Sequence, residues 1–422
     1  MRNVIKNEPS PTIQKLSSTN LIREGYRALI NNNRTYASFT RRDQELANSL
    51  VKYGEIFDPM SGYGGLARFC SENNVGSYGI EYNYPQYLWQ VLMRPNTSKE
   101  FVACIDHLLK EKKRWPHLPE KAVVSESWFP KPSRRILKEL YHRILRSTVD
   151  TFGESKENQE NSLSMLLPFV SRLSCFVAGA NSAHTKEGGI CVYWGWEEDF
   201  ELYLSCIRKN LIELSSQPAG KKHFIFHGDA RSVVLPKNRF SAMLTSPPYP
   251  NHRDFSSIFI LEIGFLEWFS LEIGLPYFNK LSPTNIIGSN FVSGKKIIKS
   301  ELAVVRKFIK SIVTLKQKKQ AEYDDKIYYI PYLEMYFSDL QKAYRNISIS
   351  LKNDFIGFIV VVNNTHRKRI VPVAESIIEM WQTLKFKAEI FDQYEQHHVG
   401  TMNPSAKGVS AKHTLYVIKV SK

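Results

Sequence analysis

The stretch around residues 56–69 constrains the fold more than any other part of the chain. Ile56-Phe57 is typical of a short buried strand, and Leu66-Ala67-Arg68-Phe69 is typical of the start of a helix. Between them lies Asp58-Pro59-Met60-Ser61-Gly62-Tyr63-Gly64-Gly65, where glycines allow the backbone to approach a ligand closely. A strand, a glycine-rich turn and a helix in this order predict an α/β fold with a binding loop at a strand end.

A second loop follows another apolar run. Thr245-Ser246-Pro247-Pro248-Tyr249 comes directly after Ser241-Ala242-Met243-Leu244. Two prolines after a strand can be only a stop signal. They also lack N–H groups and stiffen the loop, so the Pro247 carbonyl and the Ser246 hydroxyl are suited to holding an exocyclic amine. Tyr249 offers a flat face on which an extruded base can stack. Two such loops in one chain favour a functional interpretation over the stop signal.

Together the two loops resemble the S-adenosylmethionine-dependent amino-methyltransferases, most closely the DNA cytosine-N4 branch. That family has a cofactor loop of the form Asp-Pro-Phe-x-Gly-x-Gly and, in the cytosine-N4 enzymes, a catalytic loop Ser-Pro-Pro-Tyr. Here Met60 stands in place of the usual Phe, and Gly65 in place of a frequent Thr. The resemblance covers residues 36–83 and 222–265 by motifs, and 355–420 by pattern. It implies a Rossmann-like class I methyltransferase sheet that is closed by an antiparallel hairpin.

The resemblance also implies a cofactor, S-adenosyl-L-methionine, and a set of residues that bind it. Asp58 matches the acidic residue near the methionine end of the cofactor. Glu81 ends a second predicted strand and matches the carboxylate that accepts the ribose hydroxyls, with a solvated strand-end carboxylate as the alternative. Asp229 matches the residue that accepts a hydrogen bond from the adenine amino group. The implied cofactor-binding residues are Asp58, Pro59, Gly62, Gly64, Glu81, Asp229 and Ala230.

The remaining pattern predicts the order of the elements. Thr40 and Asp43 predict a helix cap ahead of an apolar helical stripe. Strands are expected near residues 55–58, 76–81, 222–227, 241–246, 355–363, 388–394 and 414–420. Helical patterns near 133–149 and 162–177 predict a largely helical insertion, interpreted as a subdomain beside the cofactor cleft or, alternatively, a target-recognition domain. The expected parts are a loose arm (1–35), two methyltransferase segments (36–83 and 222–274), the insertion (84–221), a basic segment (275–330) and a C-terminal methyltransferase segment (331–422).

The charge balance favours a polyanionic partner. The 422-residue chain has a formal charge of +16 and a pI of about 9.4, and neutralised phosphates release counterions on binding. Within the basic segment, Lys295, Lys296 and Lys299 are the candidate contacts to double-stranded DNA, with a merely solvated helix face as the alternative. The sequence shows neither a long apolar span nor a secretory signal, so we expect no membrane association and a cytoplasmic location.

The positions of the cysteines and histidines bear on whether the protein binds a metal or uses a cysteine nucleophile. Five cysteines show no C-x-x-C spacing, which argues against metal and disulfide roles. Cytosine-C5 methylation uses a cysteine nucleophile in a Pro-Cys loop, and the sequence contains no Pro-Cys dipeptide. His397 and His398 are adjacent, but the sequence shows no acidic or cysteine ligand that converges on them. We therefore expect no metal.

The sequence predicts a site-specific DNA methyltransferase that forms N4-methylcytosine on a flipped base. The catalytic residues would be Ser246, Pro247, Pro248 and Tyr249. A restriction-modification system, with a companion restriction endonuclease, is the context that the resemblance implies. Three alternatives stay open: an adenine-N6 DNA methyltransferase, an RNA base methyltransferase, and a DNA-binding protein with an inactive cofactor fold.

Overall fold

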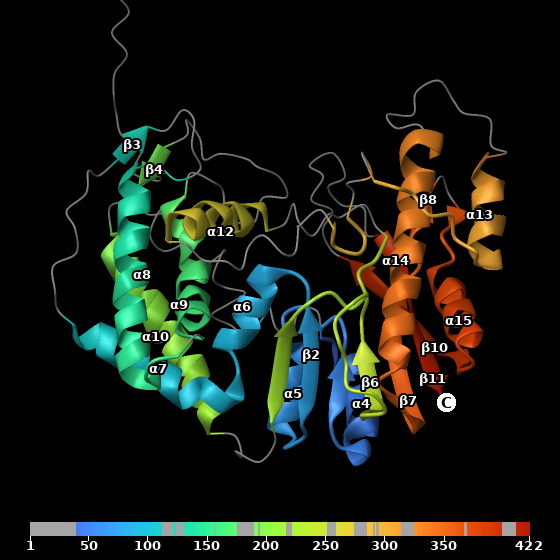
Figure 1. The fold of residues 1–422 in the computed structure, drawn as a ribbon, viewed down its shortest axis with the longest axis horizontal. Helices are drawn as coiled ribbons and strands as arrows, with labels where there is room; N and C mark the ends of the chain where they lie inside the picture. The colour runs from blue at the N-terminus through green and yellow to red at the C-terminus, as the bar shows by residue number, and fades with distance from the viewer. Residues whose placement is uncertain are drawn as a thin grey trace, which may run out of the picture. The chain divides into compact units, whose positions relative to one another are not determined.

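The main sheet of the computed structural model contains seven strands in the order β10-β11-β7-β6-β1-β2-β5 (Figure 1). Its strands are β1 (Ile56–Asp58), β2 (Ser77–Glu81), β5 (His223–His227), β6 (Phe240–Thr245), β7 (Leu351–Val362), β10 (Lys387–His398) and β11 (Ala411–Ser421). The structure describes residues 39–111, 121–123, 129, 131–155, 157–174, 190–192, 195–216, 222–250, 259–273, 285–289, 292, 295–313, 325–366, 369–398 and 411–422. The predicted N-terminal arm, residues 1–35, lies outside them.

Strand pairing confirms a mostly parallel α/β sheet with an antiparallel hairpin at one edge. β1 pairs in parallel with β2 and β6, β2 pairs in parallel with β5, and β6 pairs in parallel with β7. β11 then runs antiparallel to both β7 and β10. All seven predicted strands are present, with ends that differ from the prediction by a few residues. This arrangement is compatible with a Rossmann-like fold.

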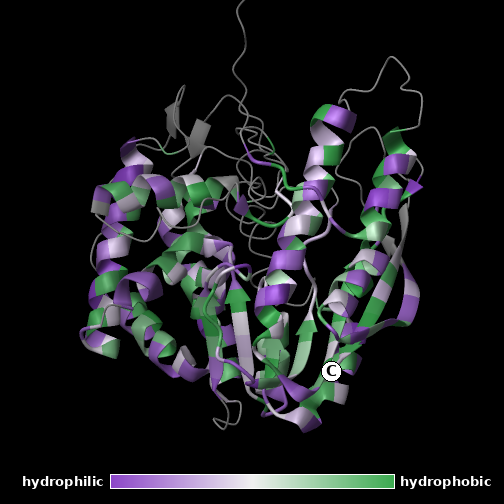
Figure 2. Ribbon diagram, turned by 45° about the vertical axis from the view of Figure 1, so that its right-hand side comes forward, coloured by the Kyte–Doolittle hydropathy of each residue, from purple (hydrophilic) through white to green (hydrophobic). Residues whose placement is uncertain are grey.

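Helices cover both faces of this sheet. On one face, α14 (Ile330–Ser348), α15 (Val373–Thr383) and α13 (Ala303–Val313) share an apolar core with β1, β2, β6, β7 and β11. On the other side, α4 (Arg41–Leu50) contacts β6 and β7, and α5 (Gly65–Glu72) contacts β2. α13 and α14 each carry hydrophobic and hydrophilic positions, as expected of helices with one buried stripe (Figure 2).

A row of aromatic rings crosses four neighbouring strands. Phe240 stacks on Phe57 at 4.3 Å between ring centroids, Phe57 meets Tyr78 at 5.8 Å, and Tyr78 stacks on Phe226 at 4.9 Å. The guanidinium of Arg239 lies 4.7 Å from the centroid of the Tyr78 ring. Each such pair adds about 0.5–1.5 kcal/mol beyond area burial. The row therefore holds together β6, β1, β2 and β5, the strands whose ends carry the candidate site.

The predicted helix cap is confirmed at the start of α4. The backbone N–H of Asp43 donates to Thr40 Oγ1 at 3.3 Å, and Asp43 Oδ2 accepts the Thr40 N–H at 2.6 Å, which completes a capping box. Leu46, Ala47 and Leu50 lie on the buried side of this helix. The cap satisfies helix-end donors and sets where α4 begins.

The chain divides into two compact units, and the first is largely helical. Within the described residues, this unit comprises Val91–Ser216 and Ile260–Leu266. It contains α7 (Ser98–Lys110), α8 (Lys131–Phe152), α9 (Asn158–Leu166), α10 (Trp196–Ser215) and a two-stranded antiparallel pair, β3 (Lys121–Val123) with β4 (Ile190–Val192). α6 (Tyr84–Leu92) and α12 (Ile260–Ile273) each contribute residues to both units.

The second helical pattern predicted in the insertion changes its type along its length. The pattern is expected near 162–177; the α-helix ends at Leu166, a 3-10 helix follows over Leu167–Leu173, and residues 175–177 lie outside the described residues. Pro168 explains the change, since it has no N–H to donate to the preceding turn.

The second unit contains the main sheet. It comprises Ser38–Gln90, Gln217–Phe259 and Glu267–Lys422. It also holds the small hairpin of β8 (Thr365–His366) and β9 (Arg369–Ile370), and a short π-helical turn at Asp325–Tyr329. Every described residue of the candidate site belongs to this unit.

Candidate functional site

The carboxyl ends of β1 and β6 meet where the sheet reverses its strand order. From β1 the chain proceeds outward to β2 and β5, and then returns to β6 on the other side of β1. Parallel pairing sets Ile56 beside Ala242 and Phe57 beside Met243, so the loops that follow start next to each other. In open α/β sheets, ligands bind outside the carboxyl ends of the strands at such a reversal. Both sequence motifs therefore lie where this architecture binds ligands.

Asp58 joins the two loops. The Thr245 hydroxyl, at the end of β6, donates to Asp58 Oδ1 at 2.8 Å, and the Met60 N–H donates to the same oxygen at 3.2 Å. Pro59, the next residue, is buried. Burial raises the pKa of Asp58 to about 7; the two hydrogen bonds oppose the rise, and the charge of Asp43 adds to it. A cation placed beside this carboxyl would restore its ionised form.

The glycine loop between β1 and α5 is held by side chains from outside the motif. The Gly62 N–H donates to Glu81 Oε2 at 2.6 Å. Gln90 Nε2 donates to Ser61 Oγ at 2.9 Å and to the Gly62 carbonyl at 2.7 Å. Gly64 has φ +79°, and a Cβ there would lie 2.9 Å from the Gln90 side chain. The left-handed backbone conformation therefore favours glycine at 64, and a Cβ there would also displace the Gln90 side chain.

Glu81 is buried and not a solvated strand-end carboxylate, with 7% of its surface exposed. Its Oε1 accepts the Asn83 N–H at 2.7 Å. Burial raises the pKa of Glu81 to about 8, against the hydrogen bonds from Asn83 and Gly62 and with a contribution from the charge of Asp58. The Asn83 side chain is 4% exposed, and within the described residues neither of its polar atoms has a hydrogen-bond partner. A polar ligand at this edge would satisfy that amide.

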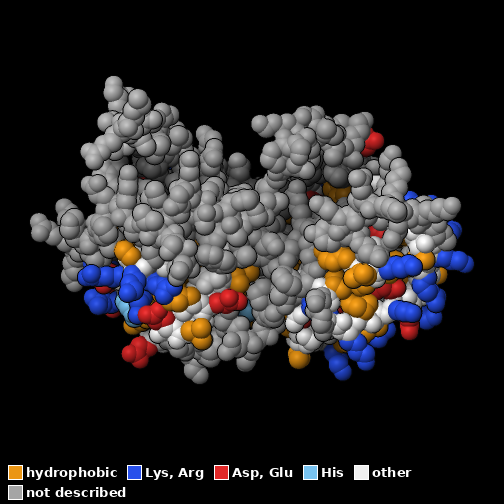
Figure 3. All heavy atoms as spheres, turned by 90° about the horizontal axis from the view of Figure 1, so that it is seen from above, with side chains coloured by type: hydrophobic (Ala, Val, Ile, Leu, Met, Phe, Trp, Pro, Cys, Tyr) orange, Lys and Arg blue, Asp and Glu red, His pale blue; other side chains and the backbone are white. Residues whose placement is uncertain are grey.

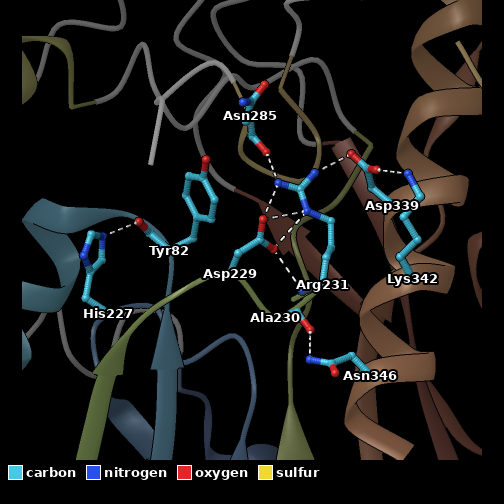
Figure 4. Close-up of polar contacts among 9 residues, drawn as sticks. All are labelled: Tyr82, His227, Asp229, Ala230, Arg231, Asn285, Asp339, Lys342 and Asn346. Atoms are coloured by element: carbon cyan, nitrogen blue, oxygen red, sulfur yellow. Dashed lines mark hydrogen bonds and ion pairs between the residues drawn. The ribbon is translucent and has the colours of Figure 1, made fainter. Parts of the chain in front are cut away.

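The third loop, after β5, is built around an arginine (Figure 4). Arg231 donates from Nε to Asp229 Oδ1 at 2.9 Å and from Nη2 to Asp229 Oδ2 at 2.7 Å. Its Nη1 reaches Asp339 Oδ2 at 2.6 Å, and its Nη2 reaches the Asn285 carbonyl at 2.6 Å. The carboxylate that the resemblance assigns to adenine is therefore held by a guanidinium. Since each carboxylate oxygen has two lone pairs, an amino group would share Asp229 with Arg231.

α14 supports this loop from one side. Asn346 Nδ2 donates to the Ala230 carbonyl at 3.1 Å and to the Val233 carbonyl at 2.9 Å. Ala230 itself is buried. The same helix contributes Asp339 to the Arg231 network (Figure 4). α14 thus sets the position of the loop that carries Asp229.

The loop after β6 has its polar groups turned toward the protein. Ser246 is exposed, Pro247 is buried, and Pro248 and Tyr249 are partly buried. Ser246 Oγ lies 2.8 Å from the Tyr249 hydroxyl. The buried Tyr336 of α14 donates its hydroxyl to the Pro248 carbonyl at 2.9 Å. Tyr249, whose ring is predicted to stack on a base, therefore hydrogen-bonds Ser246, the residue predicted to hold the amine.

The basic segment contains an amphipathic helix, α13. Lys295 is partly buried, whereas Lys296 and Lys299 are exposed. The backbone N–H of Ser300, just ahead of α13, donates to Glu334 of α14. α13 buries Val305, Phe308 and Ile312 and exposes Arg306, Lys307 and Lys310. Seen from the end at which the parallel strands finish, Lys and Arg side chains gather on the side of α13 and α15 (Figure 3).

Sequence reasoning gave no role to several residues that shape the site, among them Asn83, Gln90, Arg231, Thr245 and Tyr336. Thr245 is the first residue of the motif that ends at Tyr249, and Arg231 follows Asp229 by two residues, so their hydrogen-bonding groups were a usable signal. Gln90 lies 28 residues from Gly62, and Tyr336 lies 88 residues from Pro248. No local pattern connects residues at such separations.

Two classes of feature are absent from the part of the chain that the structure describes. It contains no group of three or more His, Cys, Asp or Glu side chains placed to hold a metal ion. None of its helices combines the length and the apolar character needed to cross a bilayer. The sequence matches no protein-family model and no curated protein, so the geometry of this site is the basis for assigning a function.

Proposed function

We propose that this protein is an S-adenosyl-L-methionine-dependent DNA methyltransferase that methylates the exocyclic N4 amine of cytosine. The observation that carries this proposal is the hydrogen bond of 2.8 Å from Thr245 to Asp58. It joins the glycine-rich loop to the Ser-Pro-Pro-Tyr loop at the sheet reversal, where a cofactor and a substrate would have to meet. Each loop by itself has several interpretations, but their junction fits group transfer.

The residues at the strand ends fit this cofactor. Asp58 and Glu81 are carboxyls whose pKa values burial raises to about 7 and about 8, and a positive ligand would stabilise their ionised forms. Asn83 presents a buried amide with no partner in the described part of the chain. The cofactor supplies a methyl group on a positively charged sulfonium. Asp58 would face its methionine end, Glu81 its ribose, and Asp229 with Ala230 its adenine.

The loop after β6 would hold the target amine. Its nitrogen is a poor nucleophile because the lone pair is delocalised into the ring, so the amine must be oriented. Ser246 and the Pro247 carbonyl would accept hydrogen bonds from the amino group and direct the lone pair at the methyl carbon. The nitrogen then bonds to that carbon and loses one proton, with no covalent bond to the enzyme. The base must leave the helix to reach this loop, and Tyr249 would stack on it.

Double-stranded DNA is the proposed partner. The chain carries a formal charge of +16, and Lys296 and Lys299 expose cations beside α13. Phosphate contacts of this kind position a protein on DNA without reading its sequence. We propose that the enzyme acts in the cytoplasm as the modification arm of a restriction-modification system, with a companion endonuclease as a further partner.

The product decides between cytosine and adenine. The purified protein is incubated with S-adenosyl-L-methionine and mixed-sequence DNA or RNA, and the nucleosides are identified by mass spectrometry after digestion. Because Ser occupies position 246, we expect N4-methylcytosine in DNA and none with the Ser246→Ala variant. N6-methyladenine alone would refute the base assignment, and methylation of RNA alone would refute DNA as the substrate. Absence of transfer to either would refute the enzymatic function.

Two further variants separate the roles of the loops. Asp58→Ala should weaken cofactor binding in calorimetry, because it removes a group that would face the cofactor. Tyr249→Ala should leave that binding nearly intact and lower turnover, since a lost base stack costs roughly 1–3 kcal/mol. The reverse pattern would contradict this division between the two loops.

A further inference from the structure

Ser246 makes two contacts, and together they determine the direction of its hydrogen bonds. Its Oγ lies 3.1 Å from the Val360 carbonyl oxygen and 2.8 Å from the Tyr249 hydroxyl. A carbonyl can only accept, and a serine hydroxyl has one proton to donate. The Ser246 proton is therefore committed to Val360. The contact with Tyr249 must then run the other way, with the tyrosine donating and the serine accepting.

The acceptor in this pair is part of the sheet. Val360 lies within β7, which pairs with β6 on one side and with β11 on the other. The register sets Thr245 beside Ile359, so the next residues along each strand, Ser246 and Val360, are neighbours. A carbonyl held between two strands keeps its place as the acceptor of the serine proton. Ser246 consequently offers incoming ligands only its lone pairs.

Tyr249 is equally restricted as a donor. Burial raises the pKa of its hydroxyl, so the proton stays in place at neutral pH. The loop that carries it is fastened at Pro248, whose carbonyl accepts the Tyr336 hydroxyl at 2.9 Å. In the structure the Tyr249 hydroxyl therefore occupies an acceptor position of Ser246, one that an amino group would take in a complex.

We infer that the Val360 carbonyl fixes Ser246 as a hydrogen-bond acceptor, and that the Tyr249 hydroxyl occupies the position of a substrate amino group. This inference rests on the proposed function for the identity of the ligand as a base. Two consequences follow. Ser246 selects bases with an amino group at the reacting carbon and rejects those with a carbonyl there, because two acceptors cannot hydrogen-bond. Tyr249 competes with the amino group for an acceptor position of Ser246, and its departure from Ser246 frees its ring for stacking.

A pair of nucleotides tests the selectivity. Cytidine and uridine 5′-monophosphate differ at ring position 4, where cytidine has an amino group and uridine a carbonyl. Binding of each to the full-length protein is followed by ligand-detected nuclear magnetic resonance. We expect the wild type to bind the cytidine nucleotide about tenfold more tightly, since the loss of one hydrogen bond between Ser246 and the base costs on the order of that factor. Ser246→Ala should remove the preference. Ser246 is exposed, and circular dichroism checks that the variant keeps its fold.

Tyr249→Phe tests the second consequence while keeping the ring. It should tighten binding of the cytidine nucleotide several-fold and leave the uridine nucleotide unchanged, because it removes only the competing hydroxyl. Tyr344→Phe is the matched control, since Tyr344 is a buried tyrosine of α14 whose hydroxyl has no hydrogen-bond partner among the described residues. It should change neither affinity.

The outcomes separate this inference from the proposed function. Equal binding of the two nucleotides by the wild type, or binding of neither, refutes the acceptor assignment even if DNA is methylated. Loss of the preference in Tyr249→Phe refutes the role given to the Tyr249 hydroxyl. A clear preference that depends on Ser246, in a protein that transfers no methyl group, supports the acceptor assignment and counts against the enzymatic function.

Discussion

Cofactor binding should release a proton from Asp58. In the free protein, burial raises the pKa of this carboxyl to about 7, so at pH 6 about nine-tenths of the molecules hold it protonated. A cationic ligand beside Asp58 favours the ionised form and lowers its pKa toward the ordinary value of about 4. Binding at pH 6 must therefore expel the proton, whereas at pH 8 the carboxylate is already ionised.

The size of the effect follows from linkage. For one group that moves from a pKa of about 7 to about 4, affinity should rise about tenfold between pH 6 and pH 8. Burial raises the pKa of Glu81 to about 8, so this carboxyl can release a second proton when the cofactor binds. The slope of log affinity against pH near pH 6 should then approach two in the wild type and about one in Asp58→Asn.

Calorimetry measures the affinity for the cofactor and its dependence on pH. Titrations with S-adenosyl-L-methionine at pH 6, 7 and 8, in buffers with different ionisation enthalpies, give the affinity and the number of protons released. Asp354→Asn is the matched control, because Asp354 is an exposed aspartate of β7 that contacts the Ser241 hydroxyl. It should leave the slope unchanged. A flat wild-type profile, or a slope that Asp58→Asn does not alter, would refute the claim that Asp58 faces the cation.

Three further outcomes are expected. The unfolding free energy of the free protein should fall as pH rises from about 4 to about 7, since the folded state keeps the Asp58 proton that the unfolded chain has released. Denaturant titrations at each pH measure this free energy, and its dependence on pH should be weaker in Asp58→Asn. Changing Lys295, Lys296 and Lys299 to Ala should weaken binding to specific and to random DNA by similar factors. It should also reduce the slope of log affinity against log salt by about 0.9 per lost contact. An unchanged slope would mean that these lysines form a solvated surface that does not contact DNA. Thr40→Ala should cost about 1 kcal/mol of stability in urea unfolding, because it removes the cap of α4.

The sequence predicts the parts of this fold that depend on neighbours in the chain. The apolar strand at Ile56-Phe57, the glycine turn and the helix after it are all present, and the Thr40 cap closes as its residue types predict. The terminal hairpin also follows from a local signal, since no helix-length pattern separates the strands that form β10 and β11. Turn chemistry, periodicity and caps act over a few residues, so one sequence is enough to read them.

The features that the sequence leaves open depend on contacts between residues far apart in the chain. The sequence interpretation leaves Glu81 open between a solvated carboxylate and a ligand-binding one, and only the structure shows that it is buried against the Gly62 backbone. Asp229 carries the acidic residue type that the resemblance requires, but Arg231 holds both of its oxygens. The insertion predicted as one block from 84 to 221 is divided differently, since the compact helical unit takes in Ile260–Leu266 and leaves the residues before Val91 with the sheet. Such groupings depend on tertiary packing that has no local signature.

α14 shows how a helix without any motif can govern the site. Tyr336 holds the Pro248 carbonyl, Asp339 holds Arg231, and Asn346 holds the Ala230 carbonyl. The spacings of three and seven residues between them correspond to about one and two helical turns, which aligns all three on one face of the helix. One rigid helix therefore sets the separation between the loop proposed to bind adenine and the loop proposed to hold the target amine. Because a methyl transfer requires donor and acceptor atoms in line and close together, a change along this face of α14 should alter turnover without touching either ligand.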